Sequence, residues 1–244
     1  MAAAGEPPNA RRQVVVFANP EKQGHKKSQD PYIPATPFRM VLAGPPGAGK
    51  RSTFLNILSN LEEAPTRIIA IHGDPDTKEY EGVVTEDVRG VDGIPDIDEM
   101  IGKEGADRDK HKLVIIDEIP WSKLPKETMS KFERLFNHVS THASTSIVLM
   151  FQQLVAIPNS VRRAADHFIL FKNIDTQAAG DLAMRVGLGR EAIQEIMGSR
   201  SKGNTKTGIV RDKHDSLWLD TTASPEDPWR MRLNLWTPIL PRVD

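Results

Sequence analysis

A glycine-rich segment near residue 45 ends in a lysine and opens a stretch with helical character. Glycines at this spacing let a backbone fold around a phosphate group with successive N–H groups pointing inward, and the following helix adds its positive end. Lys50 would then reach the β- and γ-phosphates of a nucleotide. The alternative is a Gly-Pro turn that only joins a strand to a helix. The predicted phosphate-binding residues are Gly44, Pro45, Pro46, Gly47, Ala48, Gly49, Lys50, Arg51 and Ser52.

The residue after this lysine departs from the usual pattern. A serine or threonine is expected there, because its hydroxyl holds Mg²⁺, but the chain has Arg51 followed by Ser52. One residue along a helix turns a side chain by about 100°, so Ser52 cannot simply replace the missing hydroxyl. Either Ser52 reaches the metal through an adjusted first turn, or water replaces the ligand. Ser52 is the candidate metal ligand on this helix.

Two acidic residues, Asp117 and Glu118, directly follow four apolar residues. This pattern places Asp117 at the carboxyl end of a buried strand, the edge at which open α/β sheets bind ligands. We expect Asp117 to hold Mg²⁺ through water and Glu118 to polarise an attacking water molecule. The alternative is an acidic pair that caps the next helix.

Polar residues flank the last two apolar runs. Gln152 directly follows one run, where its amide could contact the γ-phosphate or position a water molecule, although Gln153 is next to it. Arg162 and Arg163 precede the other run. An arginine supplied across a subunit interface can neutralise charge on the transferring phosphoryl group. The alternatives are a surface glutamine and a solvated helix face.

The elements that must position these residues alternate between short apolar runs and amphipathic stretches. The apolar runs are rich in β-branched residues, as buried parallel strands are. Helices are expected over 50–61 and 126–142, and a short β-hairpin over 208–220. We predict an α/β fold with a mainly parallel central sheet flanked by helices. The expected strands are Met40–Ala43, Ile68–Ile71, Leu113–Ile116, Ser146–Phe151 and His167–Phe171.

Charge and proline content divide the chain. Residues 1–36 are rich in proline and are predicted to form an extended arm with a short strand at 14–17, whereas residues 37–244 form the domain with its C-terminal hairpin and tail. Residues 73–110 carry thirteen acids against five bases and are expected to form an acidic surface segment. Residues 199–213 carry five bases against one acid around glycines and are expected to form a flexible basic loop.

Composition excludes several classes of protein. Thirty-two Lys and Arg residues balance 33 Asp and Glu residues, so the chain is not a polybasic nucleic-acid binder. The absence of cysteine excludes disulfides and thiolate metal sites. No apolar run approaches the roughly 20 residues that a membrane span needs, and the first residues lack the apolar core of a secretory signal. We expect a soluble intracellular globular protein.

The order of these motifs resembles that of the genome-packaging ATPases of double-jelly-roll DNA viruses, which belong to the FtsK–HerA superfamily. The resemblance covers residues 37–240 and rests on PFRMVLAGPPGAGK, KLVIIDEI, SIVLMFQQLVAIPNSVRRAADHFILFK and MRLNLWTPI. It implies a RecA/FtsK-like P-loop fold that hydrolyses ATP with Mg²⁺ and moves double-stranded DNA into a capsid. It also implies a homo-oligomeric ring, pentameric or hexameric, that contacts capsid vertex or portal proteins. The expected location is the host cell interior, in the cytoplasm or a virus factory, and also the virion.

The resemblance assigns roles by position. It implies that Lys50 is the phosphate lysine, Asp117 the metal acid, Glu118 the catalytic acid, Gln152 the sensor and Arg162 the arginine after the proline. The chain departs from the family at Arg51 and at Thr141, where many relatives have an arginine before the histidine. We expect the basic loop 200–213 to face the DNA and the acidic segment to face away. Two other readings remain: a P-loop kinase of small molecules, and a nucleotide-binding scaffold with little turnover.

Overall fold

The structure is a computed structural model. It describes residues 30, 32–74, 76, 78, 80–90, 96, 99, 109–172, 176–197, 201–202, 205–206, 210, 212–235 and 237–239. The predicted strand at 14–17 and most of the predicted arm lie outside the described residues.

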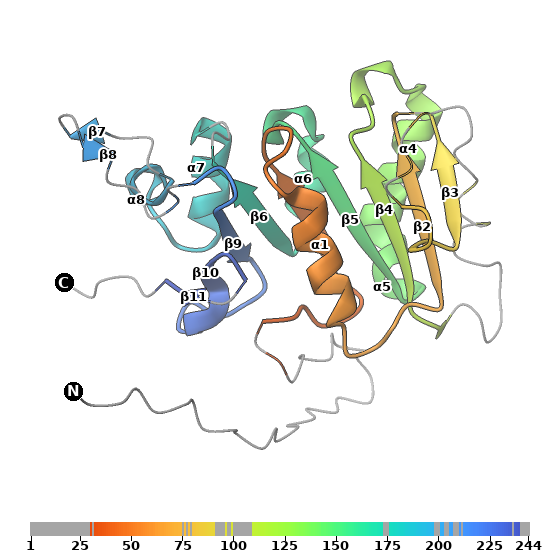
Figure 1. The fold of residues 1–244 in the computed structure, drawn as a ribbon, viewed down its shortest axis with the longest axis horizontal. Helices are drawn as coiled ribbons and strands as arrows, with labels where there is room; N and C mark the ends of the chain where they lie inside the picture. The colour runs from red at the N-terminus through yellow and green to blue at the C-terminus, as the bar shows by residue number, and fades with distance from the viewer. Residues whose placement is uncertain are drawn as a thin grey trace.

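One nine-stranded sheet forms the centre of the molecule, in the order β11-β10-β9-β6-β1-β5-β4-β2-β3 (Figure 1). The five strands predicted from apolar runs are confirmed, and they pair in parallel. This central part therefore has the predicted α/β arrangement. The five strands are β1 (Arg39–Ala43), β2 (Arg67–His72), β4 (Lys112–Asp117), β5 (Thr145–Phe151) and β6 (His167–Phe171).

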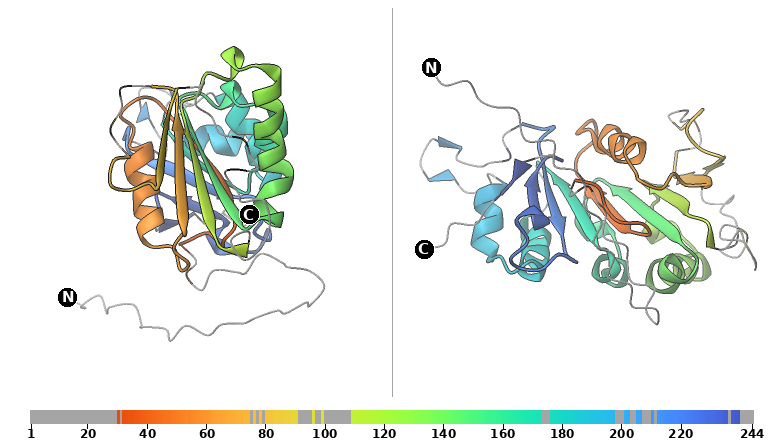
Figure 2. Two further views of the ribbon diagram at one scale, coloured as in Figure 1. Left: turned by 90° about the vertical axis from the view of Figure 1, so that its right-hand side faces the viewer. Right: turned by 90° about the horizontal axis from the view of Figure 1, so that it is seen from below.

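Helices cover both faces of this sheet (Figure 2). On one face lies α1 (Lys50–Ser59), and on the other lie α4 (Lys126–Arg134), α6 (Asn159–Ala164) and α7 (Thr176–Arg185). The predicted helix over 126–142 is present, but its middle, Leu135–Val139, is a π-helical turn before α5 (Ser140–His142). Further along the chain is α8 (Arg190–Ile196), and single turns of 3₁₀-helix lie at Trp121–Lys123, Leu154–Ala156 and Pro228–Arg230. Among the described helices, none is long and apolar enough to cross a bilayer.

The apolar strands are buried on both faces, which explains their continuous hydrophobic runs. In β1, the side chains of Met40 and Leu42 pack with Phe54 of α1, whereas Val41 belongs to the core on the opposite face with Phe132 of α4. This packing on both faces holds each parallel strand in place, so the residues at its carboxyl end have defined positions at one edge of the sheet.

Both ends of the sheet differ from the sequence-based expectation. The acidic segment contains an edge strand, β3 (Glu86–Arg89), paired in parallel with β2. At the other end, β9 (Ser216–Asp220) pairs antiparallel with β6 and with β10 (Met231–Leu233), and β10 pairs with β11 (Thr237–Pro238). C-terminal antiparallel pairing is thus confirmed, but β9 pairs with β10, which follows it in the chain, rather than with residues 208–210.

The hairpin predicted over 208–220 is correct only in its second half. Val210 is not in a strand, and its N–H donates to the carbonyl of Ile196 at 2.9 Å. Residues 208 and 209 lie outside the described part of the chain. The basic segment instead contains a separate pair of two-residue strands, β7 (Ser201–Lys202) and β8 (Thr205–Lys206).

Candidate nucleotide-binding site

The predicted phosphate loop joins β1 to α1, and the structure explains why each of its three glycine positions requires glycine. Gly44 donates its N–H to the carbonyl of Phe151 at 3.0 Å, and a Cβ at Gly44 would lie 2.5 Å from Phe171. Gly47 and Gly49 have φ values of 68° and 99°, which residues with a Cβ rarely adopt. The loop therefore has the backbone conformation that the glycine spacing predicts.

Lys50 is folded back into this loop and is almost fully buried. Its Nζ atom donates to the carbonyls of Gly44 at 2.8 Å and Pro45 at 3.3 Å, and lies 3.2 Å from Oε1 of Glu118. The ammonium group is therefore already at the loop, with a carboxylate as the counter-charge.

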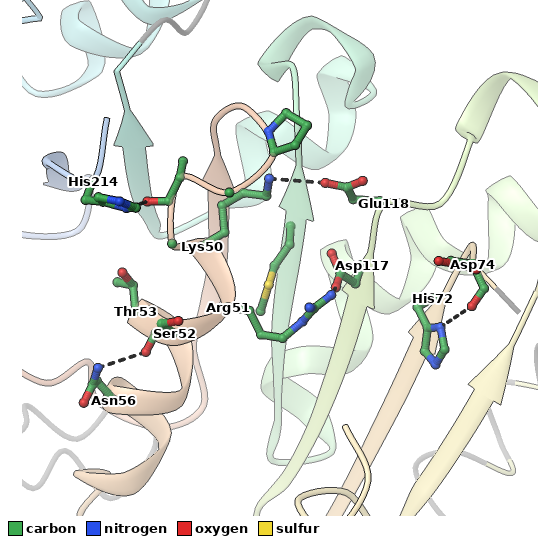
Figure 3. Close-up of a pocket in the computed structure, with 15 residues that line it drawn as sticks. Lys50, Arg51, Ser52, Thr53, Asn56, His72, Asp74, Asp117, Glu118 and His214 are labelled. Carbon is green, nitrogen blue, oxygen red and sulfur yellow. Dashed lines mark hydrogen bonds and ion pairs between the residues drawn. The ribbon is translucent and has the colours of Figure 1, made fainter. Parts of the chain in front are cut away.

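The predicted acidic pair lies at the carboxyl end of β4, as expected. Asp117 is the last residue of the strand, and its side chain is 5% exposed. Glu118 has a φ of 50°, and its N–H donates to the carbonyl of Met150 at 2.9 Å. This left-handed residue turns the chain, so the carboxylate of Glu118 reaches Lys50 while that of Asp117 faces α1 (Figure 3).

Gln152 comes to the same place from the end of β5. Its Nε2 atom donates to Oε2 of Glu118 at 2.8 Å. The structure thus brings together Lys50, Glu118 and Gln152, which come from three neighbouring strand ends. Gln152 and Gln153 are both exposed, and together with Glu118 and Trp121 they line a neighbouring cavity of about 420 Å³.

Arg51 reaches across the cavity to Asp117. Its Nη2 atom lies 2.5 Å from Oδ2 of Asp117, and the hydroxyl of Tyr80 donates to the same oxygen at 2.8 Å. The guanidinium carbon also lies 5.0 Å from the centre of the Tyr80 ring. Three side chains from the loop helix, β4 and the acidic segment therefore form one cluster.

The pKa values in this cluster follow from burial and charge. Burial raises the pKa of Tyr80, and the nearby Asp117 carboxylate raises it further, so the phenol keeps its proton and remains a donor. Burial acts to lower the pKa of Arg51, but Tyr80 and Asp117 outweigh it and raise this pKa. The cluster consequently holds a permanent positive charge beside Asp117.

The expected metal ligands do not come together. Ser52 is exposed and lies with Thr53 on the side of α1 that faces away from Asp117 (Figure 3). One carboxylate oxygen of Asp117, Oδ2, is already contacted by both Arg51 and Tyr80. Within the described residues, no group of three or more His, Asp or Glu side chains could hold a metal ion. This arrangement does not fit Mg²⁺ held by a hydroxyl and a carboxylate.

A cavity of about 630 Å³ contains this site. Its lining adds residues that sequence reasoning missed, such as His214, whose Nδ1 lies 3.2 Å from the carbonyl oxygen of Ala48. His72 also lines it, with its ring nitrogens 2.7 Å from the carbonyl of Asp74 and 2.6 Å from Oδ1 of Asp87. Neither histidine could be found from a sequence motif. The contact of His72 with Asp87 depends on how β2 pairs with β3, and the contact of His214 with Ala48 depends on the path of the chain back to the phosphate loop.

Arg162 does not join the cavity of its own chain. It lies on α6, on the face of the sheet opposite α1, and its Nη2 atom donates to Oδ1 of Asn159 at 2.9 Å. The carboxyl end of α6 is held by Arg185, which donates to the carbonyls of Arg162 at 2.7 Å and Ala165 at 3.2 Å.

Comparisons with known proteins show that the chain resembles solved structures, although its sequence matches no known family. No protein-family model matches the chain, and no curated protein sequence matches it. The genome-packaging NTPase B204 from Sulfolobus turreted icosahedral virus 2, in complex with AMPPCP, has a TM-score of 0.52 at 15% identity, covering 87% of this chain and 100% of that chain. B204 from Sulfolobus turreted icosahedral virus, a DNA-packaging ATPase, has a TM-score of 0.52 at 16% identity, covering 84% and 100%.

A third similar structure comes from another system. The cytoplasmic domain of the type VII secretion ATPase EccC from Thermomonospora curvata has a TM-score of 0.51 at 10% identity, covering 84% of this chain and 26% of that chain. At these identities the likeness establishes the fold. The chain therefore has a P-loop NTPase fold like that of the viral genome-packaging ATPase B204.

Proposed function

We propose that this chain is an ATP-hydrolysing motor that moves double-stranded DNA into a viral capsid. The observation that carries the proposal is the convergence of Lys50, Glu118 and Gln152 at the end of a phosphate-binding loop. B204, which shares the fold, is a genome-packaging NTPase whose structures include complexes with AMPPCP and ATPγS. These similarities support ATP as the nucleotide.

The chemistry follows from the contacts of Glu118. Nucleotide phosphates entering the loop compete with this carboxylate for the Lys50 ammonium group, because a phosphate carries more negative charge. Released from Lys50 but still held by the Gln152 amide, Glu118 can accept a proton from the attacking water. Gln152 thereby links the state of the phosphate site to the end of β5.

The remaining parts of the proposal concern cations and partners. The sequence motif calls for Mg²⁺ with ATP, but no hydrolytic step is assigned to Ser52 and Asp117 as a pair, since they do not converge. Arg162 lies outside its own cavity, which is where an arginine that serves a neighbouring subunit of a pentameric or hexameric ring would lie. The ring would act at a capsid vertex or portal inside the infected cell, and could travel with the virion.

Turnover of ATP with and without duplex DNA tests the proposal. A motor hydrolyses ATP faster when DNA is present, whereas a small-molecule kinase or a nucleotide-binding scaffold gives the same rate with and without it. Mass photometry of the same samples with ATP reports whether rings form. Unstimulated turnover in a sample that forms no rings would reject the motor.

The scaffold is the second candidate, and specific contacts favour it. The ion pairs Lys50–Glu118 and Arg51–Asp117 occupy the charged groups that hydrolysis needs. A scaffold would bind ATP tightly and show turnover close to that of Glu118→Gln. Binding and turnover measured on one preparation therefore separate these two functions.

A further inference from the structure

The side chain after the phosphate lysine places a guanidinium group against the acidic residue that ends β4. A hydroxyl at this position and an aspartate at the strand end are what a P-loop uses to hold a divalent cation next to the phosphates. Here Nη2 of Arg51 lies 2.5 Å from Oδ2 of Asp117, and the side chain of Arg51 lines the nucleotide cavity. A fixed positive charge therefore stands where a bound cation would otherwise stand.

We propose that Arg51 replaces the divalent cation in nucleotide binding, so that this chain binds ATP equally well with and without Mg²⁺. The inference rests on the proposed function, since it concerns the same ATP site, and it deepens that function by assigning the charge-neutralising group. A guanidinium group suits this role because its planar fork of donors matches phosphate oxygens and stays charged at all working pH values.

The contacts around Arg51 keep it in this position. The Tyr80 hydroxyl donates to Asp117 from a fully buried ring, and the guanidinium group lies near the face of that ring. Removing Arg51 from Asp117 would leave a carboxylate that is only 5% exposed without its counter-charge, which is costly. The arrangement is therefore built into the fold rather than being a chance surface contact.

The same contacts disfavour a metal at Asp117. A divalent cation placed on this carboxylate would stand beside the Arg51 cation, and two like charges at contact distance repel strongly in a partly buried site. The hydroxyl of Ser52 lines the same cavity but lies on the side of α1 that faces away from Asp117 (Figure 3). With Lys50, Arg51 instead supplies two protein cations to the phosphates.

The test is the affinity for a fluorescent ATP analogue measured in excess Mg²⁺ and in EDTA. For the wild-type protein we expect the two dissociation constants to agree within about threefold. For Arg51→Thr, which restores the hydroxyl, we expect binding in EDTA to be at least about tenfold weaker than in Mg²⁺, the scale of one lost charge-assisted contact. Arg89→Thr, which changes an arginine in β3 outside the cavity, is the matched control and should behave as wild type.

The outcomes are distinct. Wild-type binding that requires Mg²⁺ overturns the inference and leaves the proposed function standing. No binding in either condition rejects the proposed function itself, and the inference with it. If Arg51→Thr does not fold, as judged by thermal melting, Arg51→Lys is used instead, because it keeps the positive charge but lacks the planar fork of donors. The comparison of wild-type binding in Mg²⁺ and in EDTA decides the inference in either case.

Discussion

Gln152 donates a 2.8 Å hydrogen bond to one carboxylate oxygen of Glu118, whose other oxygen lies 3.2 Å from the ammonium group of Lys50. The carboxylate is thus held between an amide from the end of β5 and a cation from the phosphate loop. In the proposed function, the phosphates of a nucleotide would break the contact of Glu118 with Lys50 and leave its contact with Gln152. The separate roles of Lys50, Glu118 and Gln152 can therefore be tested by substituting each residue in turn.

Replacing Glu118 with Gln should abolish hydrolysis and preserve nucleotide binding. The variant keeps the size of the side chain but cannot accept a proton, so turnover should fall by about 10²-fold or more. ATP affinity should equal or exceed that of wild type, because the competitor for Lys50 is gone. Phosphate release and analogue binding are measured in parallel, with Glu127→Gln on the exposed side of α4 as control. Wild-type turnover in Glu118→Gln would remove Glu118 from the chemistry.

Replacing Lys50 with Ala should weaken ATP binding itself. The ammonium group lies inside the loop at 2.8 Å from the carbonyl of Gly44, so its loss removes a charge-assisted contact to the phosphates and should raise the dissociation constant by about tenfold or more. Titration with ATP by calorimetry measures this, and Lys126→Ala on α4 controls for a general loss of charge. Unchanged affinity would mean that the loop is a structural turn.

Much of this site could be predicted because the apolar strands determine it. Buried runs such as that of β4 end sharply at a polar residue, and parallel strands bring those ends to one edge. Tyr80 could not be found in this way. It is separated from Asp117 by 37 positions, in a segment whose composition resembles a surface loop, and its contact depends on a chain path that local patterns do not encode.

The edge of the sheet was missed for a related reason. β3 is a short polar strand, EDVR, whose residues are mostly half-buried, so it lacks the hydrophobic alternation that signals a strand. His214 likewise lies 166 positions from Ala48, and the return of the chain after the basic segment places it at the loop. These contacts are set by tertiary packing.

Acid should destabilise the fold through His111. Its Nδ1 lies 3.1 Å from the carbonyl of Glu63 and its Nε2 lies 2.8 Å from the hydroxyl of Ser146, an arrangement that suits the neutral ring. Burial lowers the pKa of His111 below its usual 6.5. The unfolded chain therefore binds the proton more readily, so the free energy of unfolding is intact above pH 6.5 and decreases as the pH falls below it.

Urea unfolding at a series of pH values measures this effect. Replacing His111 with Gln should lower stability at neutral pH and flatten the acid-dependent part of the curve. His142→Gln, at an exposed histidine, should leave the curve unchanged. Parallel acid curves for wild type and His111→Gln would show that other groups cause the loss.

We expect the basic hairpin formed by β7 and β8 to bind DNA. It lies at the opposite end of the molecule from β3 and the described part of the acidic segment (Figure 1). Lys202 and Lys206, changed together to Glu, should leave basal ATP turnover intact, because the nucleotide cavity is lined by other residues. The DNA-stimulated part should fall, since a motor that must hold any sequence relies on phosphate contacts.

The salt dependence of binding makes this prediction quantitative. Each lost lysine–phosphate contact should reduce the slope of log affinity against log salt by about one unit, so the double variant should lose about two. A second double variant, Lys126→Glu with Lys131→Glu on α4, makes the same change of charge away from the hairpin. If both pairs reduce stimulation equally, the effect comes from net charge. If Lys202→Glu with Lys206→Glu leaves stimulation and slope unchanged, DNA is held elsewhere, and the basic residues between 11 and 27 become the next to change.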